Sequence, residues 1–128
     1  MELGLEVSQP REDVLAISLD GEVDVYTAPQ LRKCFDEQVL DGRTWGHVVL
    51  ECLNVTVFDS TALGVSIYML KAVNRHSGNG QLAFVVKSGG KLEKTLRITG
   101  LDKVYRVFLS MDSCLAGLAP VTEEAPAE

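Results

Sequence analysis

The stretch VVLECLNVTVFDSTALGVSIYMLKAVNRH, residues 48–76, decides the fold, because it contains a strand, a junction and a helix. Its first six residues, 48–53, form a nearly continuous apolar run, which is typical of a strand buried on both faces of a parallel sheet. From Ser60 to His76, apolar residues occupy most of the circumference of a predicted helix. Buried strands that alternate with helices are the repeating units of α/β domains. We therefore expect an α/β fold.

Two strands are predicted before this stretch. Leu3, Leu5 and Val7 alternate with other residues, and apolar residues recur at period two within residues 14–19. Asp20-Gly21 is a turn signal that ends the second strand. Since no helix separates the two strands, we expect them to form an antiparallel edge of the sheet.

A helix is predicted to begin at Thr27. The sequence Thr27-Ala28-Pro29-Gln30 combines a Thr cap, Pro in the first turn and Gln three residues after the cap. The helix then carries one apolar stripe, formed by Ala28, Leu31, Phe35 and Val39. Asp41-Gly42 closes it.

After residue 76 the chain predicts two more strands and two more helices. Residues 82–86 form a buried strand, and the following helix, which Ser88 caps, carries Leu92 and Leu96 and ends at Gly100. A short strand over residues 104–108 and a helix from Ser110 to about Leu118 follow.

The whole pattern predicts one domain, residues 1–118, with a mixed, mostly parallel sheet of four to five strands and about four helices. Parallel strands need crossover connections, which the helices supply. At 128 residues the chain is long enough for one substantial core and too short for two. Residues 119–128 are rich in Pro, Ala and Glu, and we expect them to form a disordered acidic tail.

Charge and composition exclude several classes of function. A formal net charge of -6 argues against nucleic-acid partners and anionic membrane surfaces. The three cysteines, Cys34, Cys52 and Cys114, lack the spacing of a disulfide framework or a zinc site. With no signal peptide and no apolar run long enough to span a membrane, a cytoplasmic location is expected.

Enzyme motifs are absent around the serine that opens the second helix. Ser60 lacks the GxSxG elbow of serine hydrolases, and neither His47 nor His76 stands in a recognisable relation to it. The two histidines also lack neighbouring Cys or His residues, so no metal site is predicted. We expect no catalytic residue and no cofactor.

The junction before the second helix holds three small polar residues, Asp59, Ser60 and Thr61, between a buried strand and a buried helix. Amides in the first turn of a helix lack intrahelical partners and carry partial positive charge, so a phosphate there is accommodated. Phosphorylation of Ser60 would add about -1.5 to -2 charges beside Asp59 and change what the surface binds. Alternatively, Asp59 or Ser60 simply caps the helix.

Three segments together resemble the STAS-domain anti-sigma factor antagonists of bacteria. They are GEVDVYTAP at residues 21–29, FDSTALGV at residues 58–65 and LRITGLDKV at residues 96–104. In this order and spacing they are specific, and the resemblance covers about residues 5–118. It implies a STAS fold and a partner-switching regulatory protein that is not an enzyme.

In that family the unmodified protein binds an anti-sigma factor and so frees a sigma factor, in pathways such as stress response, sporulation or development. The resemblance implies three further points. The anti-sigma factor is a serine kinase that uses ATP, a PP2C-type phosphatase restores the unmodified form, and Ser60 is the phosphorylated residue. Thr61 is a reserve acceptor. Asp24 matches the acidic residue that lies near the serine, although it is equally interpretable as a turn or capping residue.

The expected partner-binding residues are Asp24, Tyr26, Thr27, Asp59, Ser60, Thr61, Ala62 and Leu63. Ala62 departs from the family, which usually has Gly there. Ala disfavours positive φ but is the better helix former, so the departure affects either phosphorylation or only the firmness of the first turn. The alternative function is a non-switching STAS subunit of a stressosome-like or transporter-associated complex.

Overall fold

The computed structural model describes residues 3–40, 46–76 and 79–120. The elements follow in chain order as β1 (Leu3–Arg11), β2 (Val14–Val23), α1 (Ala28–Phe35), a π-helical turn η1 (Asp36–Leu40), β3 (His47–Phe58), α2 (Ser60–His76), β4 (Leu82–Val85), α3 (Lys91–Ile98), a 3₁₀ turn η2 (Leu101–Lys103), β5 (Arg106–Phe108) and α4 (Met111–Gly117). Strands and helices alternate after β2, as predicted.

The strands form one mixed sheet with the order β1-β2-β3-β4-β5. β1 pairs with β2 antiparallel, and the pairs β2–β3, β3–β4 and β4–β5 are parallel. This confirms the predicted α/β class, the antiparallel edge and the mostly parallel sheet. The carboxyl ends of β2, β3 and β4 therefore lie along the same side of the sheet, where sites in α/β folds are found.

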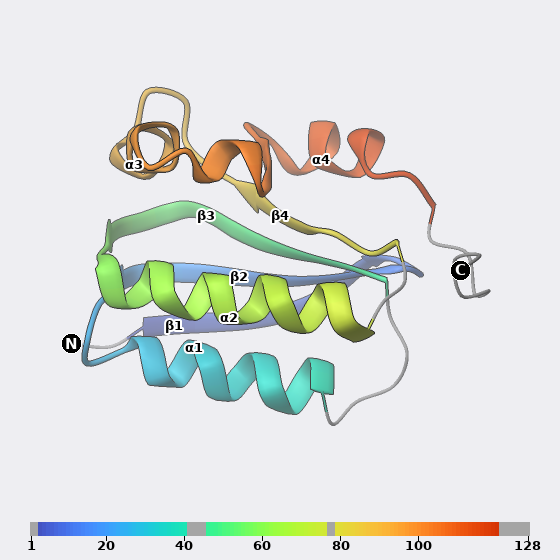
Figure 1. Ribbon diagram of the computed structural model, residues 1–128, viewed down its shortest axis with the longest axis horizontal. Coiled ribbons are helices and arrows are strands. Elements are labelled where there is room, and N and C mark those ends of the chain that lie inside the picture. The colour runs from blue at the N-terminus through green and yellow to red at the C-terminus, as the bar shows by residue number, and fades with distance from the viewer. Residues whose placement is uncertain (1–2, 41–45, 77–78, 121–128) are drawn as a thin grey trace.

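Helices cover the two faces of the sheet unequally. The larger core lies between the sheet and α1, α2 and α3, and it contains the whole predicted stripe: Ala28, Leu31 and Phe35 in α1 and Val39 in η1. A smaller core lies between α4 and the other face, with Cys114 and Leu118 packed on Val14, Ala16, Val49, Ala83 and Val85. Figure 1 shows α1 and α2 running alongside each other, and α4 apart from them across the sheet.

The central strands run farther than the sequence predicted. The predicted turn at Asp20-Gly21 is wrong, because β2 continues to Val23 and pairs with a β3 that reaches Phe58 instead of ending at residue 53. Gly21 adopts φ 120°, a conformation that favours glycine. Two register shifts give β3 an extra residue at each of two places, and such bulges often lie beside functional sites.

The start of α3 also differs from the prediction. Ser88 does not cap the helix; the cap position is held by Gly90, which makes no side-chain capping bond. Glu93 instead reaches back and accepts a hydrogen bond from the Gly89 N–H at 2.7 Å. Gly89 has φ 74°, so the turn before the helix depends on glycine.

Three further outcomes concern the second half of the chain. Gly100 ends α3 in the left-handed conformation, at φ 77°, as predicted. β5 begins at Arg106, two residues later than predicted, because Val104 and Tyr105 donate their N–H groups to the Leu101 carbonyl and continue the turn η2. Ser110 caps α4 by accepting a hydrogen bond from the Ser113 N–H, which confirms the predicted start of that helix.

Some expectations fall outside the part of the chain that the structure describes. They are the helix end at Asp41-Gly42 and the tail beyond Pro120. Across residues 3–40, 46–76 and 79–120, no helix is both long and apolar enough to cross a membrane.

Candidate functional site

Two polar loops begin side by side at the carboxyl ends of β2 and β3. Val23 and Phe58 are paired in the parallel ladder, and the Asp59 N–H donates to the Val23 carbonyl at 3.2 Å. Asp24 and Asp59, each the next residue along its chain segment, therefore open neighbouring loops. Figure 1 shows that α1 and α2, which follow these loops, begin at the same end of the molecule.

Asp59 caps helix α2. Its carboxylate Oδ1 accepts a hydrogen bond from the Ala62 N–H at 3.0 Å, and its carbonyl accepts one from the Leu63 N–H at 2.9 Å. Of the two candidate caps at the junction, Asp59 has this role and Ser60 does not. The helix start is therefore stabilised without the Ser60 side chain.

Ser60 and Thr61 are the exposed residues of this helix start. Within the described residues, the Ser60 hydroxyl has no hydrogen-bond partner. The N–H groups of both residues lie in the first turn, before any carbonyl that they could reach within the helix. The site thus offers a free hydroxyl beside amides that favour a negative charge.

The Asp24 loop is organised by its carboxylate. Asp24 Oδ1 accepts hydrogen bonds from the N–H groups of Tyr26 at 2.9 Å and Thr27 at 3.1 Å. The loss of water around Asp24 raises its pKa, but the hydrogen bonds from Thr27 and Tyr26 outweigh this, and its pKa lies below the ordinary value. Asp24 therefore has the turn and capping role that the sequence allowed. Its role in partner binding stays a prediction.

Thr27 does not cap α1 with its side chain, which corrects the sequence prediction. Its hydroxyl donates to the Glu22 carbonyl at 2.7 Å and accepts from the Asp24 N–H at 3.0 Å. Thr27 is fully buried. It holds the loop in shape and presents no contact surface in this structure.

Ala62 is also fully buried, inside the first turn of α2. Its methyl group belongs to the larger core, and no described non-glycine residue has positive φ. The conformational freedom of a glycine is therefore not needed at this position. The milder of the two interpretations made from the sequence, that Ala62 firms the first turn, therefore stays our expectation.

The exposed apolar surface of the site comes from the Asp24 loop. Tyr26 is 82% exposed and Val25 56% exposed, and Val57 near the end of β3 is 39% exposed. Clustered exposed apolar side chains are a mark of interaction surfaces. The resemblance identified Tyr26, but Val25 and Val57 were not predicted, because the sequence alone does not show which apolar residues near the site are exposed.

Packed aromatic rings connect the end of β3, next to the site, with β4 and the segment before β5. The rings of Phe58 and Phe84 lie 6.0 Å apart, and those of Phe84 and Tyr105 lie 4.9 Å apart. The Tyr105 hydroxyl is 2.7 Å from the hydroxyl of Ser66, which itself donates to the Leu63 carbonyl at 2.7 Å. Ser66 thus links the second turn of α2 to Tyr105, and the Tyr105 ring in turn packs on Phe84 of β4.

His47, one of the two histidines considered as catalytic or metal-binding residues, is far from Ser60. It begins β3, whereas Ser60 follows the end of that strand, which at its length spans roughly 35 Å. The buried His47 ring lies 2.6 Å from the Ala119 carbonyl and accepts from the Gln81 N–H at 3.0 Å. His47 therefore anchors the segment after α4 and is not a general base for Ser60.

No group of three or more His, Cys, Asp or Glu residues in the described ranges is arranged to hold a metal ion. Cys52 and Cys114 are buried, and burial raises the pKa of the Cys114 thiol to about 11 although Arg106 and Arg11 lower it. These two thiols are core residues. The described residues around Ser60 offer an exposed hydroxyl at a helix start but no pair of nucleophile and base.

A match to the STAS domain family covers residues 7–114, most of the chain. The chain belongs to the STAS family. This STAS domain is 31% identical to the anti-sigma-B factor antagonist of Staphylococcus aureus, over 84% of this chain and 94% of the relative. It is 34% identical to the anti-sigma-B factor antagonist of Staphylococcus epidermidis, over 75% of this chain and 84% of the relative.

Solved structures confirm the STAS fold. An anti-sigma factor antagonist from Mycobacterium paratuberculosis superposes with a TM-score of 0.76 at 22% identity, covering 90% of this chain and 92% of that one. The unphosphorylated form of the anti-sigma factor antagonist SpoIIAA superposes with a TM-score of 0.66 at 12% identity, covering 90% of this chain and all of that one, 100%. At these identities the likeness establishes the fold alone.

Proposed function

We propose that this STAS domain is a cytoplasmic anti-sigma factor antagonist, a binding protein and not an enzyme, that phosphorylation of Ser60 switches off. The observation that carries the proposal is the Ser60 hydroxyl. It is exposed, has no partner within the described residues, and stands at a helix start that Asp59 already caps. A modification there changes the surface without removing a stabilising contact.

The chemistry of the surface supports the switch. In the unmodified state a partner would meet the apolar side chains of Tyr26 and Val25, with Asp24, Asp59, Thr61 and Leu63 around Ser60. A phosphate on Ser60 would bond the amides of the first turn and place about two negative charges beside Asp59. A partner shaped for the neutral hydroxyl would then face a bulky dianion that it must desolvate.

The names of the relatives support an anti-sigma factor as the partner. The name anti-sigma-B factor antagonist indicates a protein that acts on an anti-sigma factor, and one structural neighbour is described as SpoIIAA in its phosphorylated form. We propose that the unmodified chain binds an anti-sigma factor that is also the ATP-dependent serine kinase. A PP2C-type phosphatase would reverse the modification, and the released sigma factor would direct transcription.

The first experiment is phosphorylation by the cognate anti-sigma kinase with ATP, followed by mass spectrometry. We expect one phosphate on Ser60, and none on the Ser60→Ala variant. The Thr61→Ala variant is the matched control, because Thr61 is exposed on the same helix turn. If the kinase phosphorylates neither Ser60 nor Thr61 in the parent chain, the switch is refuted.

The second experiment is titration calorimetry of the anti-sigma factor against the parent chain and Ser60→Asp. A complete shift from bound to free requires about 5.5 kcal/mol of differential affinity, and a single carboxylate should supply only part of it. Equal affinities would contradict the proposal. A large assembly in size-exclusion chromatography that Ser60→Ala does not alter would instead indicate the non-switching structural subunit.

A further inference from the structure

Positive charge is concentrated in one segment of an acidic chain. Residues 87–106 contain six of the twelve Lys and Arg residues but two of the eighteen Asp and Glu residues, so the segment carries +4 and the rest of the chain carries -10. The segment comprises α3, η2 and the loops around them. This segment is positively charged, whereas the rest of the chain is negatively charged.

The lysines of the segment are exposed and unpaired. Lys87, Lys91, Lys94 and Lys103 are all exposed, and none forms an ion pair within the described residues. Lys91 is the first residue of α3 and Lys94 lies one turn later. Cations at a helix start oppose the helix dipole, so these two lysines do not stabilise α3.

An exposed apolar residue lies on the same stripe of the helix. Lys91, Lys94 and Ile98 follow the spacing i, i+3, i+7, on the side away from the buried Leu92 and Leu96. Ile98 is 80% exposed, and Val104 just after η2 is 55% exposed. A single exposed apolar side chain is common on protein surfaces, so it is the unpaired lysines beside Ile98 that distinguish this stripe.

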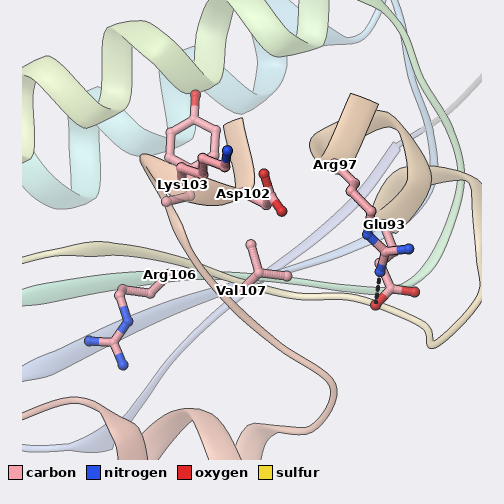
Figure 2. A pocket seen from close by; sticks show the side chains of 7 residues that line it. Glu93, Arg97, Asp102, Lys103, Arg106 and Val107 are labelled. Atoms are coloured by element: carbon pink, nitrogen blue, oxygen red, sulfur yellow. Dashed lines mark ion pairs between the residues drawn. The ribbon is translucent and has the colours of Figure 1, made fainter. Parts of the chain in front are cut away.

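The arginine on α3 belongs to a different face. Figure 2 shows the side chains that line a hollow beside α3, η2 and β5, where Arg97 and Glu93 point toward each other. The Arg97–Glu93 pair is 3.4 Å apart. Charges of both signs line the hollow, including Lys103 and Arg106, and three cations there face two carboxylates. The other three cations of the segment, Lys87, Lys91 and Lys94, do not line the hollow and carry most of its uncompensated charge.

We propose that this outer surface, which we call the α3 basic surface (Lys87, Lys91, Lys94, Ile98 and Val104), binds an acidic protein segment that carries apolar side chains. Carboxylates about one helical turn apart would meet Lys91 and Lys94, and an apolar side chain about one further turn along would cover Ile98. The complementary charge selects the partner and speeds its encounter, while burial of Ile98 and Val104 provides the apolar centre of the interface.

A protein partner fits this surface better than other polyanions do. Nucleic acid gains little from an isolated Ile and a Val, and the described surface here has no exposed aromatic ring on which a base could stack. The α3 basic surface is thus distinct in chemistry from the Ser60 site, which is acidic, and the proposal does not rest on the proposed switch.

The test measures fluorescence anisotropy with the full chain and a labelled random copolymer of glutamate and tyrosine. Lys87→Gln/Lys91→Gln/Lys94→Gln should weaken binding by about tenfold, since each exposed ion pair contributes modestly. Lys33→Gln/Lys71→Gln/Arg75→Gln removes the same charge from exposed residues elsewhere and should change binding by less than about twofold. Equal losses in both variants would overturn the proposal.

Further probes separate the kinds of partner. Ile98→Ser should weaken binding of the glutamate–tyrosine copolymer but not of polyglutamate, because only the former has apolar groups to cover Ile98. Ser60→Asp should leave both unchanged. If duplex DNA or phosphatidylglycerol vesicles bind the chain more tightly than the copolymer, or if Ile98→Ser has no effect, the surface does not recognise an acidic protein segment. Circular dichroism of each variant verifies that it is folded.

Discussion

Helices α2 and α3 follow neighbouring strands of the sheet, but the side chains at their starts have opposite charge. Each follows a parallel strand, and those strands, β3 and β4, are neighbours. α2 begins with the acidic cap Asp59 and two exposed hydroxyl residues, whereas α3 begins at Gly90, with no side-chain cap and with exposed lysines around it. The fold positions both helix starts, but only their side chains decide what each one can recognise.

The largest effect on stability is expected for Ala62→Gly, which makes the start of α2 resemble the usual family sequence. Loss of helix propensity and of a buried methyl group should lower the free energy of unfolding by about 1–2 kcal/mol. Urea denaturation measures it. Gly64→Ala on the same helix is the control: Gly64 is exposed and nothing lies within 4 Å of the added Cβ, so it should stabilise. An unchanged stability for Ala62→Gly would show that the first turn does not depend on Ala62.

The next effect is expected for Asp59→Ala, which removes the acidic cap and leaves α2 as poorly capped as α3. The Ala62 N–H loses its acceptor, so the free energy of unfolding should fall by about 1 kcal/mol. Asp59→Asn keeps an acceptor oxygen and should lose less. If thermal unfolding shows equal losses in both variants, the hydrogen bond to Ala62 is not what stabilises the helix start.

A smaller effect of opposite sign is expected for Lys91→Glu at the start of α3. The carboxylate would favour the helix dipole, so the protein should gain about 0.5 kcal/mol of stability. The same change should weaken binding of the glutamate–tyrosine copolymer. Loss of stability in thermal unfolding would mean that Lys91 makes a stabilising contact.

The smallest effect concerns pH and the Asp24 loop. Because the folded state lowers the pKa of Asp24, its contribution to stability is present above the unfolded pKa of about 3.9 and is lost as pH falls through the lower folded value. Asp24→Asn should remove this dependence while retaining an acceptor for Tyr26 and Thr27. Urea denaturation at about pH 6 and pH 3 compares the two chains, and parallel pH profiles would contradict the assignment.

The elements that the sequence predicted well are those with an apolar pattern of their own. The stripe of α1, the buried residues of β4 and the glycine end of α3 all follow from local spacing or local conformation. The start of α2 at Ser60 was also predicted, because small polar residues interrupt two apolar runs. The candidate site was found through three short motifs, which only in combination point to the STAS family.

The mispredicted features depend on which of several possible partners a group finds, either on a distant strand or a few residues away. β2 continues through Asp20-Gly21 because it pairs with residues 54–58 of β3. The local turn signal contains no information about that distant partner. Thr27 does not cap α1 because its hydroxyl is bonded to the Glu22 carbonyl, and Ser88 does not cap α3 because Glu93 already bonds the turn. Side chains choose among competing partners only once the chain is folded.

The amino-acid sequence by itself determined the α/β class, the single domain, the family and the serine at the head of α2, since apolar periodicity and short motifs are local properties. Only the tertiary structure decided that Asp59 is the cap, that Ser60 is free, that Thr27 and Ala62 are buried, and that Tyr26 and Ile98 are exposed. Exposure and hydrogen bonding depend on which distant groups the fold brings together, and no single stretch of sequence contains that information.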